Sequence, residues 1–200
     1  MKQDWTGSKE GVFSTLGATN HFDSERQNED YYATDPKAVK FLLELEKFKD
    51  MMVWECACGE GHLSKEMEEM GFEVFSTDLI DRNYGNGIYD FLGPDNNEVL
   101  EINIITNPPF RYANDFIRKG MSILAKGYKM ALFLPIRYLE GKERKRIFKQ
   151  YPPKKVLVTS SRINCSKNGE FETMGGTAIG YAWFIWEKDF KGKPTLEWFN

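Results

Sequence analysis

The feature that most constrains the fold is Asn107-Pro108-Pro109-Phe110, which directly follows the apolar run 102–106 (INIIT). A run rich in β-branched residues favours a buried strand. Neither proline can donate a backbone hydrogen bond, and both fix φ near about −65°, so the strand has to end there. Because α/β sheets bind ligands beyond the carboxyl ends of their strands, we expect a binding or catalytic site at this turn.

The side chains of this turn suit a planar amine. Asn107 offers a carbonyl acceptor, and the Pro108 carbonyl, which precedes a second proline, is not consumed by a helix turn, so two acceptors can converge on one amino group. Phe110 adds a flat apolar face. The stretch resembles the (Asp/Asn/Ser)-Pro-Pro-(Tyr/Phe) motif of N6-adenine DNA methyltransferases, and this resemblance implies that Asn107, Pro108, Pro109 and Phe110 are catalytic. The alternative is a rigid turn after a strand.

A glycine turn follows an earlier expected strand, 51–55, and precedes an expected helix, 63–70. A strand, a glycine turn and a helix open many nucleotide-binding units. A nicotinamide cofactor is disfavoured because the strand ends at an acidic residue and the third small residue is Ser64 rather than glycine or alanine. The turn resembles the S-adenosylmethionine (SAM) motif I, which implies cofactor contacts from Glu55, Cys56, Ala57, Gly59 and Gly61.

Acidic residues end two further segments. The expected strand 72–77 stops at Asp78, about twenty residues beyond the glycine turn, where a carboxylate can accept hydrogen bonds from ribose hydroxyls. Leu79 could then pack on the adenine, and Asp90-Phe91 resembles the adenine-contacting motif III. The alternative for Asp78 is a cap for the next turn.

The N-terminal 30 residues are polar and charged, so we expect a flexible arm or lid ahead of one methyltransferase domain, 31–200. A helix of about three turns should begin near Pro36, with Thr34 or Asp35 as its cap. A capped helix shortly before the first strand resembles motif X of the family. That resemblance implies that Tyr32 and Thr34 lie near the methionine end of the cofactor.

Basic residues gather late in the chain, between Lys142 and Lys155, with Glu143 as the opposing charge. A solvated helix face is the common meaning of such a run, and phosphate contact by Arg144, Lys145 and Arg146 is the competing one. The segments 156–159 and 177–186 should pair as an antiparallel hairpin, with the second strand closing the sheet. The connecting loop is long, so we expect target contacts from it, by Arg162, Asn164 and Lys167.

Composition sets outer limits. A 41% hydrophobic content in 200 residues is enough for one sizeable core, and the net charge of −3 does not by itself indicate a nucleic-acid binder. We see no membrane span and no signal-peptide core, so we expect a cytoplasmic protein, or one of the host cytoplasm if a phage encodes it. Three cysteines and two histidines, without metal-ligand spacing, predict free thiols and no metal site.

Strands alternating with helices and ending in a hairpin predict an α/β protein with a mostly parallel Rossmann-like sheet. This arrangement resembles the class I methyltransferase fold. The motif order resembles the gamma arrangement of small phage-type adenine methyltransferases, which implies SAM as cofactor and DNA as substrate. RNA bases and protein glutamine are alternative substrates. Since 200 residues leave no room for a large recognition domain, a non-catalytic SAM-binding or DNA-binding accessory protein is another alternative. A dehydrogenase is the least favoured, and the oligomeric state is left open.

Overall fold

The computed structural model describes residues 33–94, 98–160, 163, 165–166 and 179–199. The expected N-terminal arm lies outside these residues. The secondary structure follows the expected alternation of strands and helices: β1 Ala33–Thr34, α2 Lys37–Leu45, β2 Met52–Glu55, α3 His62–Glu69, β3 Glu73–Asp78, β4 Gly87–Ile88, β5 Asn103–Thr106, η1 Phe110–Tyr112, α4 Ala113–Ile123, β6 Lys129–Pro135, η2 Ile136–Leu139, α5 Lys142–Gln150, β7 Lys155–Thr159, β8 Cys165–Ser166, β9 Tyr181–Glu187 and β10 Thr195–Phe199.

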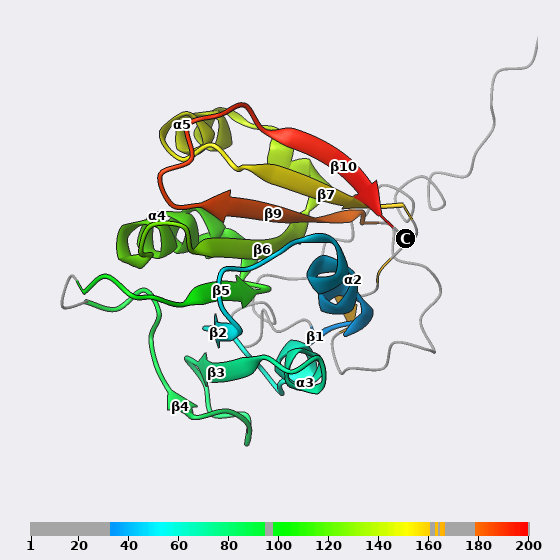
Figure 1. Cartoon of the computed structure of the whole chain (residues 1–200), viewed down its shortest axis with the longest axis vertical. Helices are drawn as coiled ribbons and strands as arrows, with labels where there is room; N and C mark the ends of the chain where they lie inside the picture. Colours follow the sequence, from blue (N-terminus) through cyan, green and yellow to red (C-terminus); the bar gives the residue numbers. More distant parts are fainter. Residues whose placement is uncertain (1–32, 95–97, 161–162, 164, 167–178, 200) are drawn as a thin grey trace, which may run out of the picture.

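Within the described residues, the main sheet has eight strands in the order β10-β7-β9-β6-β5-β2-β3-β4, which can be followed down Figure 1. Neighbouring strands are parallel except around β9, which runs antiparallel to both β6 and β7. The predicted mostly parallel α/β sheet is therefore confirmed, as is the antiparallel pairing of β7 with β9. The carboxyl ends of the parallel strands all meet at one edge of the sheet.

The prediction that residues 177–186 close the sheet is wrong. β9 lies inside the sheet between β6 and β7, and Trp183, Phe184 and Trp186 are fully buried. The edge strand is β10, which pairs in parallel with β7 and which the sequence did not reveal. Its residues are mostly exposed, so the apolar pattern of a buried strand is missing from it.

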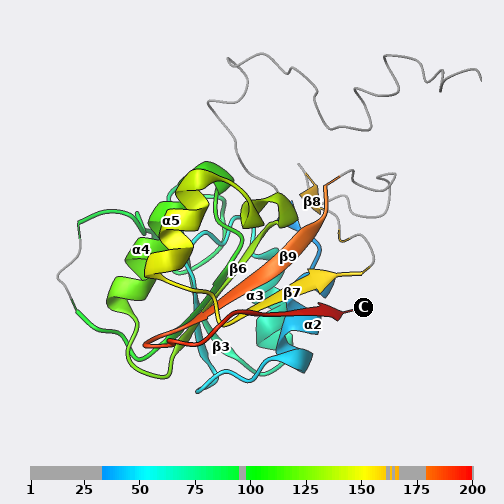
Figure 2. The ribbon, with the colours of Figure 1, turned by 90° about the horizontal axis from the view of Figure 1, so that it is seen from above.

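Helices cover both faces of the sheet (Figures 1 and 2). On one face, α2 and α3 bury Val39, Leu42 and Met67 against Phe133 and Trp183 of the sheet. On the other face, α4 and α5 pack on a second cluster that includes Phe184. The sheet therefore stands between two hydrophobic layers, as expected for a sheet whose strands read as nearly continuous apolar runs.

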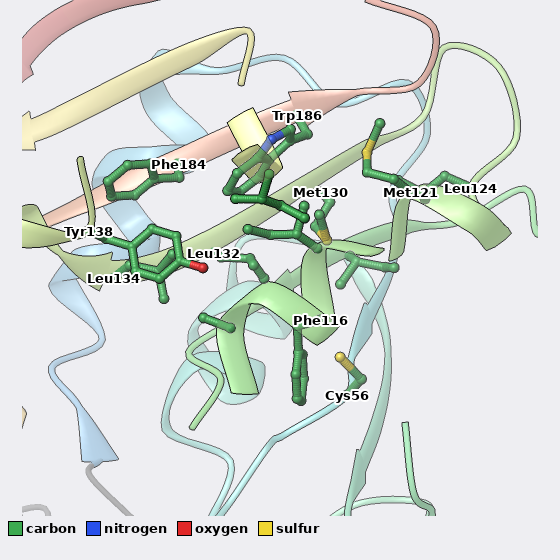
Figure 3. Close-up of a cluster of buried hydrophobic side chains, with 14 of the residues drawn as sticks. Cys56, Phe116, Met121, Leu124, Met130, Leu132, Leu134, Tyr138, Phe184 and Trp186 are labelled. Atoms are coloured by element: carbon green, nitrogen blue, oxygen red, sulfur yellow. The ribbon is translucent and has the colours of Figure 1, made fainter. Parts of the chain in front are cut away.

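Helix α4 lies unusually close to the sheet at Gly120. A Cβ atom at this position would lie 2.4 Å from Sδ of Met130 in β6, so only glycine fits without a shift of the methionine. Figure 3 shows Phe116 of α4 and Met130 within the same buried cluster. Because α4 follows the Asn107–Phe110 turn after one 3₁₀ turn, this contact also fixes how that turn leaves β5.

A two-stranded sheet forms beside the main one, between β1 and β8, with Thr34 opposite Cys165. The sequence predicted Thr34 or Asp35 as the helix cap, and neither occupies that position: Thr34 is a strand residue, and the residue before α2 is Pro36. Oδ1 of Asp35 does accept a hydrogen bond from the Lys37 backbone at 3.0 Å, just ahead of the helix.

Candidate active site

Three neighbouring strands bring the chemical groups together. β5, β2 and β3 are adjacent and parallel, and their carboxyl ends lead into Asn107, Glu55 and Asp78. A cavity of about 360 Å³ lies at this edge, a volume within the usual range of small-molecule sites. Most of the predicted site residues line it: Thr34, Glu55, Cys56, Ala57, Asp78, Leu79, Asp90, Phe91, Asn107, Pro108, Pro109 and Phe110.

The two predicted glycines support the cavity without lining it. Gly59 (φ 56°) and Gly61 (φ 79°) are both left-handed, as expected of glycines in a tight turn. The Gly59 backbone donates to Oδ2 of Asp78 at 2.8 Å. A Cβ at Gly61 would lie 2.2 Å from the ring of Tyr84, which covers this glycine. Direct cofactor contact by the glycines remains a prediction, and the structure supplies another reason for Gly61.

Asp78 is held by the backbone on both sides. Besides the bond from Gly59, its Oδ1 accepts from the Ile80 backbone at 3.0 Å, so the turn-capping interpretation is also correct. Each carboxylate oxygen has a second lone pair, and the residue lines the cavity. Leu79 and Ile80 beside it are exposed apolar side chains at the cavity wall. This arrangement leaves capacity for two donors from a ligand.

Glu55 faces a polar cluster at the base of the cavity. It is buried, its Oε2 accepts a hydrogen bond from Oγ of Ser64, and Ser64 Oγ lies 2.7 Å from Oγ of Ser76. Burial raises the pKa of Glu55 to about 8; the Ser64 hydrogen bond opposes this shift, and the charges of Asp78 and Glu68 add to it. Glu55 is therefore mostly neutral at pH 7, which the sequence pattern did not indicate.

The two residues predicted to contact adenine, Asp90 and Phe91, differ in burial. Phe91 is buried, with its ring centroid 5.2 Å from that of Trp54 and 4.8 Å from that of Phe116, so it belongs to the core as well as to the cavity wall. Asp90 is exposed, and its Oδ1 accepts from the Leu92 backbone at 2.9 Å.

The Asn107 turn has the geometry that its prolines predict. Pro109 has φ −55° and ψ 120°, after which Phe110 begins η1. Nδ2 of Asn107 donates to Oγ1 of Thr34 at 2.8 Å. The Phe110 ring is tilted against Tyr181, with the ring centroids 6.0 Å apart, and part of it lines the cavity.

Several cavity residues were missed by the sequence analysis. Among them are Arg82, Tyr89, Arg111 and Tyr112. The guanidinium of Arg111 lies 4.6 Å from the centre of the Tyr112 ring. Arg111 and Tyr112 directly follow the Asn107–Phe110 turn, so their place at the cavity could have been expected from that adjacency. Arg82 and Tyr89 belong to an irregular segment that carries no periodic signal.

The basic segment divides into two parts. Lys154 pairs with Glu187 at 2.6 Å and Lys155 with Glu46 at 3.0 Å, so these two lysines serve the fold. On α5, Arg146 pairs with Glu143 at 2.6 Å, whereas Lys145 is exposed. Arg144 stacks over Tyr138 at 4.7 Å and donates to the Glu140 carbonyl. The predicted phosphate contacts by Arg144, Lys145 and Arg146 are untested.

Four other predicted site residues, Tyr32, Arg162, Asn164 and Lys167, lie outside the described residues. Cys56, Cys58 and Cys165 are buried free thiols. Across the described ranges, no group of three or more His, Cys, Asp or Glu side chains could hold a metal ion. Within the same ranges, no helix has the length and apolar character needed to cross a bilayer.

No protein-family profile and no curated protein sequence matches the chain. Solved structures do match its fold. A Listeria monocytogenes protein assigned as a class I SAM-dependent methyltransferase aligns with a TM-score of 0.58 at 15% identity, over 94% of this chain and 71% of that one.

Two further matches are modification subunits. The M protein of the type I restriction enzyme EcoKI aligns with a TM-score of 0.57 at 15% identity, over 82% of this chain and 45% of its own. A Vibrio vulnificus subunit, from a protein assigned as a type I restriction enzyme, aligns with a TM-score of 0.56 at 15% identity, over 96% and 51%. The chain thus spans about half the length of these two subunits. At such identities the likeness shows the fold, which is that of class I SAM-dependent methyltransferases.

Proposed function

We propose that the protein is a SAM-dependent methyltransferase that modifies the N6 amino group of adenine in DNA, with the motif order of the small phage-type enzymes. The observation that carries the proposal is the placement of the Asn107–Phe110 turn. This turn lines the same cavity as Asp78, and its strand β5 is the direct neighbour of β2, which leads into the glycine turn. The proposed cofactor site and the proposed site for a planar amine therefore share one cavity.

The cavity suits SAM in size and in its mixture of charges. Asp78 could accept hydrogen bonds from ribose hydroxyls while Leu79 and Phe91 flank the adenine. The carboxylates of Asp78 and Asp90 and the guanidinium groups of Arg82 and Arg111 all line the cavity, which suits a ligand that carries charges of both signs, as SAM does. Bound SAM would supply a methyl group on a positively charged sulfur, which an amine can attack without a protein nucleophile.

The Asn107 turn would orient the target amine. The Asn107 side chain and the Pro108 carbonyl would accept its two hydrogens, which turns the nitrogen lone pair out of conjugation with the ring. Phe110 would stack on the base. Such stacking contributes about 1–3 kcal/mol, comparable with the few kcal/mol that flipping a base out of a duplex costs. The turn could therefore hold a flipped adenine.

DNA is favoured over the other substrates by two observations. Two of the structural matches are modification subunits of type I restriction enzymes, and α5 presents exposed lysines such as Lys145. The accessory-protein alternative retains one argument, because the chain spans about half of those subunits. Incubation with labelled SAM and, separately, DNA, RNA and protein, followed by nucleoside and amino-acid analysis, distinguishes the candidates. Label in N6-methyladenine from DNA is the expected outcome, and binding of SAM without transfer favours the accessory role.

Substitution of Asn107 tests the mechanism. Asn107→Ala should slow single-turnover methyl transfer by about 10²–10³, the usual cost of losing a preorganised polar partner. Its affinity for SAM should stay unchanged. Asn107→Asp should retain more activity, because a carboxylate still accepts from the amine. Methyl transfer by Asn107→Ala at the wild-type rate would reduce the turn to a structural role.

A further inference from the structure

Thr34 contacts the proposed catalytic side chain from outside the main sheet. It lies in β1, opposite Cys165 of β8, and 3% of its surface is exposed. Its Oγ1 accepts the hydrogen bond from Nδ2 of Asn107 at 2.8 Å. The two residues are 73 positions apart, so this contact is a product of the tertiary fold. It ties the Asn107 carboxamide to the β1–β8 pair.

A second contact anchors the Thr34 side chain. The Cys165 thiol is buried, and its pKa is raised to about 12 by burial, against opposing hydrogen bonds from the hydroxyls of Tyr181 and Thr34. Thr34 and Cys165 are also partners in the β1–β8 pair, so β8 and its buried thiol hold the Thr34 hydroxyl beside Asn107.

We propose that Thr34 is a positioning residue that decides which end of the Asn107 carboxamide faces the target amine. With Nδ2 held by Thr34, Oδ1 takes the other branch of the carboxamide, as an acceptor for an amino group. A flipped carboxamide would point its NH₂ group, a donor, at the amine, which is also a donor. The identity of the amine rests on the proposed function, whereas the orientation of Asn107 does not.

This assignment gives Thr34 a role different from the predicted cofactor contact. Its hydroxyl group accepts the hydrogen bond of Asn107 at the wall of the same cavity. Loss of the hydroxyl should therefore lower the transfer rate and leave SAM affinity unchanged. If Thr34 contacted the cofactor instead, loss of the hydroxyl should weaken SAM binding and leave the transfer rate at saturating SAM unchanged.

The orientation can be measured without any activity. In ¹⁵N-labelled protein, the Nδ2 amide pair of Asn107 is identified by its loss in Asn107→Asp. Thr34→Val keeps the shape and removes the acceptor, so solvent exchange of the Asn107 amide should speed up by about tenfold or more. Thr34→Ser keeps the hydroxyl and should preserve the wild-type exchange rate. Equal exchange in wild type and Thr34→Val would overturn the assignment.

The kinetic consequence needs a matched control. Thr106 immediately precedes Asn107, it is fully buried, and its Oγ1 has no hydrogen-bond partner among the described residues. Thr106→Val is thus the same chemical change without a lost bond, and it should transfer methyl groups at the wild-type rate. Thr34→Val should lower the single-turnover rate about tenfold, the upper range for loss of one neutral hydrogen bond. Thr34→Ser should restore it to within about threefold.

A double-mutant cycle separates positioning from general damage to the fold. If Thr34 acts through Asn107, adding Thr34→Val to Asn107→Ala should cost nothing further. Additive losses would refute the coupling. Thr34→Ala offers a second route if Thr34→Val does not fold, because it also removes the acceptor of Asn107 and should lower the rate in the same way. An unchanged rate in Thr34→Ala would refute the positioning role.

The two proposals fail in different ways. If the wild type methylates no substrate, the proposed function fails, and the amide exchange of Asn107 still decides whether Thr34 holds the carboxamide. If methyl transfer is present but neither the rate nor the exchange responds to Thr34→Val, the positioning role fails and the proposed function stands.

Discussion

Glu55→Gln should make the protein more stable at neutral pH. Glu55 is buried, and burial raises its pKa to about 8 from an ordinary 4.5. A group whose pKa is raised in the folded state contributes its full share of stability below the unfolded pKa, and that share is lost as the pH rises through the folded pKa. Between pH 4.5 and 8, the unfolded chain therefore carries an ionised Glu55 that folding must protonate.

The magnitude follows from this interval. At about 1.4 kcal/mol per pH unit, the wild type should lose about 3 kcal/mol between pH 4.5 and pH 7 through Glu55 alone. Glutamine has nearly the same shape, can still hydrogen-bond to Ser64, and does not titrate. In a chain of this length, the Tm of Glu55→Gln should therefore exceed that of the wild type by about 6–12 °C at pH 7.

The assay is urea unfolding followed by circular dichroism, at several pH values from 4.5 to 8 and with reductant present for the free thiols. Subtracting the free energy of unfolding of the wild type from that of Glu55→Gln at each pH removes the contribution of every other titrating group. Glu73→Gln is the matched control, because Glu73 is an exposed residue of β3 and its curve should stay parallel to the wild type. A constant difference between wild type and Glu55→Gln across this range would show that Glu55 is not held as a neutral acid.

Three further predictions concern ligands. Because cationic SAM favours an ionised Glu55, the affinity of the protein for SAM should rise between about pH 6 and 8 and level off above that range. Calorimetry should show proton release on binding, and Glu55→Gln should abolish the pH dependence. Asp78→Ala should weaken SAM binding about tenfold or more, from about 1.5–3 kcal/mol per charged hydrogen bond, and unchanged calorimetric affinity would remove Asp78 from the site. Neutralising Arg144, Lys145 and Arg146 together should weaken DNA binding similarly for all sequences and flatten its salt dependence, while a wild-type salt slope would make α5 a solvated face.

Local signals in the sequence were enough to predict the sheet around the cavity. Strands β2, β3, β5 and β6 are short apolar runs that end at acidic residues or prolines, and α4 has its apolar residues at helical spacing. β10 lacks such a signal, because an edge strand with mostly exposed residues needs no apolar pattern. The spacing of apolar residues reflects which side chains are buried. It therefore identifies a strand only where at least one face of that strand is covered.

The residues that line the cavity were largely predictable, and their contacts were much less so. Asp78 and Asn107 could be placed at the cavity because each ends or directly follows a strand. That Thr34 pairs with β8 rather than capping α2 depends on Cys165, 131 positions away. Glu55 turns toward Ser64, and Tyr84 covers Gly61, for reasons that only the folded chain supplies. Sequence patterns identify which residues reach an edge of the sheet, and long-range packing decides what each then does.

The interior position of β9 has a consequence for synthesis. β6 and β7 are made before β9, and in the finished sheet both pair with it and not with each other. Until residue 187 has left the ribosome, both strands present unpaired edges, and the core lacks Trp183, Phe184 and Trp186. Open edges beside an incomplete apolar core are sites of aggregation. During synthesis, strands β2, β3, β5 and β6 can therefore be paired while β9 is still missing. A slow passage of the ribosome from residue 160 to residue 187 prolongs the exposure of the unpaired edges.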